Sequence, residues 1–118
     1  MTDFVYKPDC HLIEQSEEHV LLKLKIPENL YYFQGHFPQV AILPGVVQLD
    51  WVMHYLNKYL AVDTSKAVSI DALKFQIIVK PNYEIELCLK QVKANKFSFS
   101  YSSTQGQHAS GKVVLTDE

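Results

Sequence analysis

Residues 34–60 read QGHFPQVAILPGVVQLDWVMHYLNKYL, and the rest of the chain can be arranged around them. A Gly-His-Phe-Pro loop leads through an apolar run to Pro44 and Gly45. Proline suits the first turn of a helix because its φ angle is fixed and its missing N–H would be unpaired there. The sequence therefore predicts a helix over residues 45–60. Apolar residues cover most of its circumference, which predicts a central helix that is buried on nearly all sides.

Two polar residues stand out in this segment. Asp50 lies in the middle of the apolar helix, where an unpaired buried carboxylate would cost on the order of several kcal/mol. His36 stands in the loop between Gly35 and Phe37. A polar pair in apolar surroundings is where a functional site is expected, so we interpret His36 and Asp50 as its candidate residues.

The chemistry of this pair favours proton abstraction next to a carbonyl group. Histidine is the side chain best suited to take a proton near neutral pH. A carboxylate in an apolar pocket tends to a raised pKa and can then act as an acid. The helix N-terminus at Gly45 would present unpaired backbone N–H groups to a developing oxyanion. Base, acid and oxyanion donor thus fall within one short segment.

Each of these residues also has a structural explanation. A single histidine in a Gly-Pro loop often only shapes the loop. Asp50 could pair with His54, which stands four residues later on the same helix face. A metal site formed by His36, Asp50 and His54 is a third reading, but the three show no recognised ligand spacing, and we expect no metal.

Strand patterns flank the predicted helix on both sides. They cover residues 10–15 and 19–26 before the helix and residues 68–79, 83–92, 97–102 and 107–115 after it. Short turns between consecutive strands predict an antiparallel meander. A sheet wrapped around one helix, with no linker or repeat, predicts a single α+β domain over residues 1–118. The remaining histidines, His11, His19 and His108, fall in strand or turn segments and are expected at the surface.

Composition excludes several classes of protein. An apolar fraction of 47% and a charged fraction of 20% are typical of a globular protein rather than a disordered one. The net charge is −2 and all 11 basic residues are lysines, which argues against nucleic-acid binding. The N-terminus lacks a signal-peptide pattern and no apolar run reaches membrane-spanning length. Cys10 and Cys88 are expected to be reduced in a soluble cytoplasmic protein.

The central segment resembles the hot-dog-fold 3-hydroxyacyl-(acyl-carrier-protein) dehydratases of the FabA/FabZ group, and it looks most like the ApeI type associated with aryl polyene clusters. The resemblance is carried by GHFP at residues 35–38, LPGV at residues 43–46 and an acid, Asp50, fourteen residues after His36. A weaker match is KFxxxVKP at residues 74–81, similar to the family pattern KFxxxVxPGD.

This resemblance implies a hot-dog homodimer that converts a 3-hydroxyacyl thioester on an acyl carrier protein into the trans-2-enoyl thioester without a cofactor. His36 would be the base at C2, and Asp50 the acid that assists loss of the hydroxyl group. The N–H of Gly45 would polarise the thioester carbonyl, and Phe37 and Pro44 would contact the substrate. In the family, the histidine and the acid come from different subunits.

Four positions depart from the family pattern. Gln39 and Ala41 stand where the fatty-acid enzymes usually have Gly and Pro, which predicts a differently shaped loop. Asp50 matches the isomerising branch, whereas the more common dehydratases carry Glu; isomerase activity does not follow from this alone. Asn82 replaces a Gly after Pro81, which changes a turn rather than the chemistry.

The carrier protein of the family is acidic, so the resemblance also implies a lysine patch near the tunnel mouth. Lys74 and Lys80 are the candidates, with Lys58 or Lys66 as additional ones; the alternative is that they are ordinary surface lysines. Two other functions remain open. A hot-dog thioesterase would use the helix carboxylate to activate water, and a non-catalytic acyl-binding subunit would need His36 and Asp50 only for structure.

Overall fold

A computed structural model of the chain describes residues 4–33 and 41–116, and these form one antiparallel sheet with one long helix. The elements, in chain order, are β1 (Asp9–Gln15), β2 (His19–Lys25), the 3-10 helix η1 (Tyr31–Phe33), α1 (Gly45–Leu60), the 3-10 helix η2 (Thr64–Lys66), β3 (Ala67–Phe75), β4 (Glu84–Lys93), β5 (Lys96–Ser103) and β6 (Gly106–Leu115). The predicted α+β class, the helix over residues 45–60 and the six strands are confirmed.

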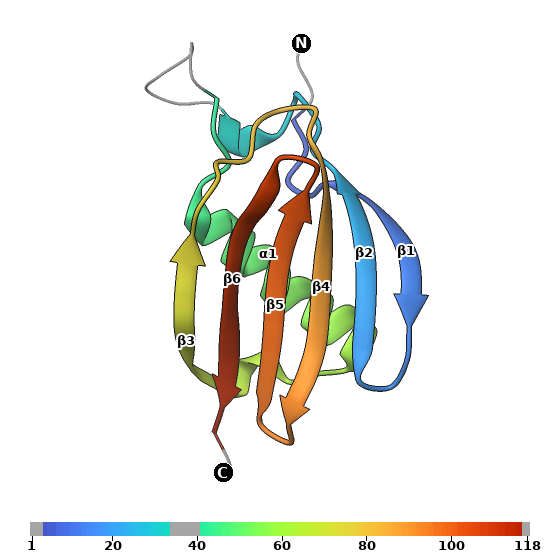
Figure 1. Ribbon diagram of the computed structural model, residues 1–118, viewed down its shortest axis with the longest axis vertical. Helices are drawn as coiled ribbons and strands as arrows, with labels where there is room; N and C mark the ends of the chain where they lie inside the picture. Colours follow the sequence, from blue (N-terminus) through green and yellow to red (C-terminus); the bar gives the residue numbers. More distant parts are fainter. Residues whose placement is uncertain (1–3, 34–40, 117–118) are drawn as a thin grey trace.

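The order of the strands in the sheet is β1-β2-β4-β5-β6-β3, and every pairing is antiparallel (Figure 1). The predicted meander is right for β4, β5 and β6 but wrong for β3, which lies beside β6 at the edge of the sheet. The connection over residues 76–83 is too long for a tight hairpin, and it carries β4 to the opposite side, next to β2. Predicted strand residues 76–79 belong to this connection.

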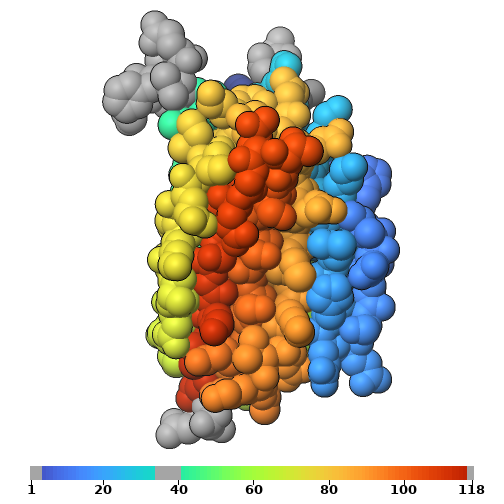
Figure 2. Space-filling view, viewed as in Figure 1, coloured from blue at the N-terminus to red at the C-terminus, as the bar shows by residue number. Residues whose placement is uncertain are grey.

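The helix packs against one face of the sheet, and the core lies between them. Figure 2 shows the other face, which no further layer of the described residues covers. Alternate residues of the strands point inward, as the pleat of a strand requires. The fully or nearly fully buried inward side chains are Val20, Leu22 and Leu24 of β2, Ile85, Leu87 and Leu89 of β4, and Phe97, Phe99 and Tyr101 of β5. They meet Trp51, Val52, Tyr55 and Leu56 of α1 in one apolar cluster.

The prediction that α1 is buried on nearly all sides is wrong for the single chain. One stripe of the helix, at positions 46, 50 and 54, is open to solvent, and Val46 is 74% exposed. The buried residues of the helix lie on the opposite side and face the sheet.

Two further observations concern the chain as a whole. No helix in the described ranges is long and apolar enough to span a membrane. Cys10 on β1 and Cys88 on β4 are both free and half-buried.

Candidate active site

The N-terminus of α1 has the conformation that the Leu-Pro-Gly sequence predicts. Pro44 is the N-cap residue, with extended backbone angles of φ −62° and ψ 146°, and it provides no side-chain cap. Its carbonyl oxygen accepts hydrogen bonds from the N–H groups of Val47 (3.1 Å) and Gln48 (3.2 Å). No hydrogen bond joins the N–H of Gly45 to another residue of the described part of the chain. As the first residue of the helix, Gly45 also has no partner within the helix.

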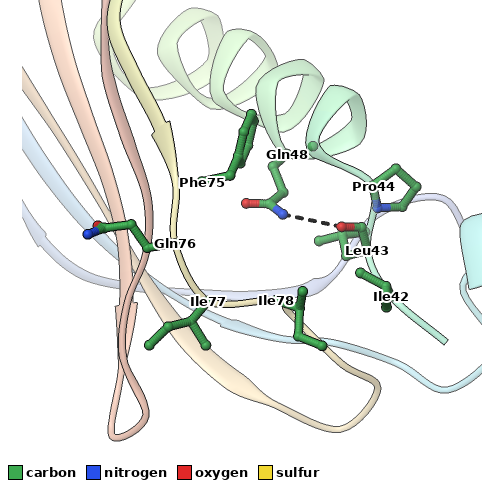
Figure 3. A pocket seen from close by; sticks show the side chains of 9 residues that line it. Ile42, Leu43, Pro44, Gln48, Phe75, Gln76, Ile77 and Ile78 are labelled. Carbon is green, nitrogen blue, oxygen red and sulfur yellow. Dashed lines mark hydrogen bonds between the residues drawn. The ribbon is translucent and has the colours of Figure 1, made fainter. Parts of the chain in front are cut away.

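A cavity of about 390 Å³ opens beside this helix end. It lies between the start of α1 and the segment that follows β3, as Figure 3 shows. Its lining residues are Ile42, Leu43, Pro44, Gly45, Gln48, Phe75, Gln76, Ile77 and Ile78. The two walls are joined by a 2.8 Å hydrogen bond from the N–H of Leu43 to the carbonyl oxygen of Val79. A mostly apolar cavity with a free N–H at its rim suits an acyl chain whose carbonyl oxygen needs a donor.

Phe75 covers the Cα atom of Gly45. A Cβ atom at position 45 would lie 2.7 Å from Cζ of Phe75, closer than real Cβ contacts occur. The ring is itself 49% exposed, so it forms a wall of the cavity rather than part of the core. Glycine at position 45 therefore lets the aromatic ring approach the helix end. Phe75 was not a predicted site residue, although it belongs to the segment 74–81 that the sequence comparison singled out.

Asp50 does not lie in the cavity of its own chain. It is exposed on the outer stripe of α1 and is not one of the residues that line the cavity. The expectation that Asp50 is buried in apolar surroundings is wrong within one chain. Two residues of separation on an α-helix correspond to about 200°, so Asp50 and the cavity-lining Gln48 point in nearly opposite directions.

The other predicted residues divide into two groups. His36 and Phe37 lie outside the described residues, so their positions relative to Asp50 and Gly45 stay predictions. Pro44 and Gly45 lie together at the rim of the cavity, as expected for substrate-binding residues. The structure thus places Pro44 and Gly45 at the cavity, and their roles toward a substrate stay predictions.

The structural pairing of Asp50 with His54 is not seen. The two residues form no hydrogen bond or ion pair in the described part of the protein, where the ion pairs join Lys23 to Glu84 and Lys96 to Asp71. Partial burial, followed by the charges of Lys7 and Lys58, lowers the pKa of His54, and the charge of Asp50 opposes this shift. Asp50 therefore influences His54 electrostatically without being held by it.

Two buried polar residues were missed by the sequence analysis. Gln48 is only 4% exposed and lines the cavity. His108, expected at the surface, is 1% exposed. Its ring bonds to the carbonyl oxygen of Ile77 (Nδ1, 3.1 Å) and to Oγ of Ser103 (Nε2, 2.6 Å). The backbone oxygen of His108 accepts from the N–H of Gln76 at 2.9 Å, so His108 fastens one wall of the cavity to β6.

The candidate docking lysines occupy different places. Lys74 lies beside Lys90 and Lys112 around a shallow hollow of about 290 Å³, whose lining also contains the outward residues Ser98 and Ser100. Lys80 is exposed in the connection after β3 and does not line this hollow. Lys58 lies in the last turn of α1 and Lys66 in η2 just after it, at the opposite end of the helix from Gly45, and we do not retain them as docking residues.

No group of three His, Cys, Asp or Glu side chains that could hold a metal ion occurs in the described ranges. The possible metal site formed by His36, Asp50 and His54 includes His36, which lies outside these ranges, so the structure does not test it.

Comparison with known proteins identifies the family. The family model of the ApeI-like proteins, described as ApeI dehydratase, matches residues 12–112. The chain is 30% identical over 102 residues to the 3-hydroxyacyl-[acyl-carrier-protein] dehydratase FabZ of Petrotoga mobilis, covering 79% of this chain and 72% of that protein.

Solved structures agree with the fold. The dehydratase heterocomplex ApeI:P from Xenorhabdus doucetiae contains a chain with a TM-score of 0.83 and 33% identity, covering 92% of this chain and 97% of that one. An uncharacterized protein from Erwinia carotovora has a TM-score of 0.73 and 35% identity, with 94% of each chain covered. Mouse thioesterase superfamily member 2 shares the fold alone, with a TM-score of 0.71 at 14% identity over 90% of this chain and 80% of that one. The fold is therefore the hot-dog fold, and the chain belongs to the ApeI-like dehydratase family.

Proposed function

We propose that this protein dehydrates a 3-hydroxyacyl thioester carried by an acyl carrier protein to the trans-2-enoyl thioester, in aryl polyene or fatty-acid-like biosynthesis. The observation that carries the proposal is the apolar cavity at the N-terminus of α1, with the N–H of Gly45, unpaired among the described residues, at its rim. Membership of the ApeI-like dehydratase family and similarity to a protein named as an acyl-carrier-protein dehydratase support the substrate class.

In the proposed mechanism, the thioester carbonyl oxygen accepts a hydrogen bond from the N–H of Gly45. His36 takes a proton from C2, and negative charge develops on the carbonyl oxygen, where the helix N-terminus stabilises it. The C3–O bond then breaks as the hydroxyl group takes a proton from Asp50 and leaves as water. The C2–C3 double bond forms, and Phe37 and Pro44 hold the substrate in place.

A second copy of the chain would complete this site. The exposed position of Asp50 supports this part of the proposal, because its carboxylate points away from the cavity of its own chain. Exposed apolar side chains occur both on this helix stripe and on β3 at the edge of the sheet: Val46 is 74%, Val68 64% and Phe75 49% exposed. An edge strand with exposed apolar residues is a surface that pairs readily with another chain. We therefore propose a homodimer in which Asp50 faces the His36 loop of the other subunit.

Light scattering coupled to size exclusion tests the assembly. The wild type should elute as a dimer, and Val46→Lys should shift it toward the monomer. Leu12→Lys is the matched control, since Leu12 is 47% exposed on β1 at the opposite edge of the sheet. A wild-type chain that is monomeric alone and assembles only with a different dehydratase chain would replace the homodimer by a heterocomplex, which is the form named for the Xenorhabdus relative.

A paired assay tests the reaction. Enoyl absorbance and free thiol are followed together on one carrier-bound 3-hydroxyacyl thioester, for the wild type, His36→Ala and Asp50→Asn. We expect enoyl product without thiol release from the wild type, and its loss by at least about a hundredfold in both variants. Asp9→Asn, at an exposed carboxylate of β1, should keep full activity. Thiol release without enoyl product would instead indicate a thioesterase, and neither signal from a folded dimer would indicate a binding subunit.

The proposal extends to location and docking. Free thiols at Cys10 and Cys88 are compatible with the reducing cytoplasm, where we place the protein.

Lys74 stands on the strand that supplies Phe75 to the cavity, on the adjacent position of the pleat. Because successive side chains of a strand point to opposite faces, Lys74 lies on the outer face of the sheet, and an acidic carrier that contacts Lys74 and Lys80 would approach the end of β3 from that face.

A further inference from the structure

The side chain of Gln48 is buried in the cavity wall with one half of its carboxamide unpaired. Its Nε2 atom donates a hydrogen bond to the carbonyl oxygen of Leu43 at 3.3 Å. Its Oε1 atom is the only buried side-chain nitrogen or oxygen without a hydrogen-bond partner in the described part of the chain. In Figure 3 the oxygen turns away from Leu43, toward the side of the cavity that Phe75 forms.

This arrangement fixes the direction of the unpaired oxygen. The bond to Leu43 holds the nitrogen end of the carboxamide, and a 2.6 Å hydrogen bond from the hydroxyl of Tyr101 to the carbonyl oxygen of Gln48 ties its backbone to β5. The neighbouring lining residues are apolar, apart from Gln76, whose side chain points away from Gln48 in Figure 3. A buried acceptor without a donor costs about 1–3 kcal/mol, so the fold carries this oxygen at a cost to its own stability.

We propose that Oε1 of Gln48 is a substrate-binding group that accepts a hydrogen bond from the 3-hydroxyl group of the acyl chain. This inference rests on the proposed function, which supplies the substrate class. Within the acyl part of a 3-hydroxyacyl thioester, the hydroxyl group is the only hydrogen-bond donor. An apolar cavity whose wall holds one buried side-chain acceptor without a donor matches a ligand that is an apolar chain with a single donor.

The position of Gln48 relative to Gly45 fits this role. Both residues line the same cavity, three positions apart and therefore nearly one helical turn apart. A carbonyl oxygen bound to the N–H of Gly45 and a hydroxyl group bound to Gln48 would hold C2 and C3 between them. Since Asp50 of the same chain points the opposite way, the hydroxyl oxygen stays free to take its proton from the other subunit's acid in the proposed dimer.

Binding measurements with two matched ligands test the inference. The probes are a 3-hydroxyacyl pantetheine amide and the acyl pantetheine amide that lacks the hydroxyl group, over a series of chain lengths. The amide replaces the thioester so that the C2 protons are too weakly acidic for turnover. Calorimetry gives the ratio of the two dissociation constants for the wild type and for Gln48→Met, in which an unbranched side chain of similar length lacks the carbonyl oxygen.

We expect the wild type to bind the hydroxylated ligand about tenfold more tightly than the deoxy ligand. Gln48→Met should lose this preference while still binding the deoxy ligand. Equal affinity of the wild type for both ligands, or an unchanged preference in Gln48→Met, would overturn the role of Gln48 and leave the dehydratase proposal standing. If neither ligand binds at any length, the acyl substrate class fails and the inference fails with it.

A second measurement needs no variant and keeps the inference testable if Gln48→Met does not fold. The ¹³C resonance of the Gln48 carboxamide carbon in the wild type should shift on addition of the hydroxylated amide and much less on addition of the deoxy amide. Identical shifts with both ligands would show that Oε1 does not meet the hydroxyl group. A purely structural role for Gln48 predicts that outcome.

Discussion

The ring of Phe75 fills the space that a side chain at position 45 would need, since a Cβ atom there would lie 2.7 Å from its Cζ atom and 3.0 Å from its Cε1 atom. The two residues come from the end of β3 and the first position of α1, and both line the cavity. Glycine at position 45 therefore leaves the space that the Phe75 ring occupies beside the helix end.

Gly45→Ala should therefore impair catalysis more than stability. The added methyl group must push the half-exposed ring of Phe75 into the cavity, where the substrate would lie. We expect kcat/KM for the dehydration to fall about 10- to 100-fold, with a change in the free energy of unfolding below about 1 kcal/mol. In a Phe75→Leu background, Gly45→Ala should reduce kcat/KM by a smaller factor than it does in the wild type. Additive losses in the double variant would show that the ring is not the cause.

Tyr101→Phe should destabilise the fold. The Tyr101 hydroxyl is fully buried and donates to the carbonyl oxygen of Gln48 at 2.6 Å. Its removal should lower the free energy of unfolding by about 1–2 kcal/mol in denaturant titrations. Tyr59→Phe is the matched control, because the hydroxyl group of Tyr59 has only a weak 3.8 Å contact with Sγ of Cys10. Equal losses in the two variants would contradict a specific contribution from the Tyr101 bond.

The order of the elements could be predicted from the sequence, because alternation and turn residues are local signals. Phe97, Phe99 and Tyr101 alternate with serines and are all buried, as such a pattern indicates. The place of β3 could not be predicted in this way. Its partner is β6, more than 30 residues later, and no local signal distinguishes this pairing from a hairpin with β4.

The orientation of α1 could not be predicted from the sequence, and the arrangement of the candidate site depends on it. Apolar residues lie all round this helix, so the sequence does not show which side faces the sheet. Asp50 and Gln48 both interrupt the apolar run, and the sequence pattern favours the charged residue as the site residue because a buried charge costs more than a buried amide. In the folded chain Gln48 is the buried one and Asp50 is exposed. The place of Pro44 and Gly45 at the start of the helix could be predicted because it depends on a local signal, and both line the cavity; their roles toward a substrate stay predictions.

The titration of His54 should respond to its neighbours in opposite directions. Burial, and then the charges of Lys7 and Lys58, lower its pKa, whereas Asp50 raises it. Lys7→Gln or Lys58→Gln should therefore raise the pKa of His54 in an NMR titration, and Asp50→Asn should lower it further. A shift of the same sign in the Lys7 and Asp50 variants would contradict this electrostatic account.

The same shift gives a pH dependence of stability. The pKa of His54 in the folded chain lies below its unfolded value of about 6.5, so the unfolded state binds the proton first as the pH falls. The contribution of His54 to the free energy of unfolding is fully present above about pH 6.5, and it is lost as the pH falls through the pKa of His54 in the folded chain. His54→Gln should flatten this part of the melting temperature profile, whereas His11→Gln, on exposed β1, should leave the drop in place.

Charge reversal at the candidate docking lysines should separate carrier-bound from free substrates. Lys74→Glu/Lys80→Glu is expected to raise the KM for a carrier-bound 3-hydroxyacyl substrate about 10-fold and to leave a small thioester analogue unaffected. The rise should shrink as salt is added, since both lysines are exposed. Lys93→Glu, at the exposed end of β4, controls for net charge. Equal effects on both substrates would argue against docking at these residues.

His108→Ala should loosen the cavity wall as well as weaken the fold. The substitution leaves the carbonyl oxygen of Ile77 and the hydroxyl group of Ser103 without their ring partner and opens a hole in a buried site. We expect a loss of about 2–4 kcal/mol in the free energy of unfolding and a raised KM at temperatures where the protein is folded.

Ser103→Ala is the control for this variant: it keeps the ring of His108 and its bond to Ile77, so its KM should stay near that of the wild type. Faster amide exchange at Gln76 and Ile77, whose N–H groups both donate to the backbone oxygen of His108, should accompany His108→Ala but not Ser103→Ala. Unchanged exchange at these two positions would mean that the backbone bonds alone hold the wall.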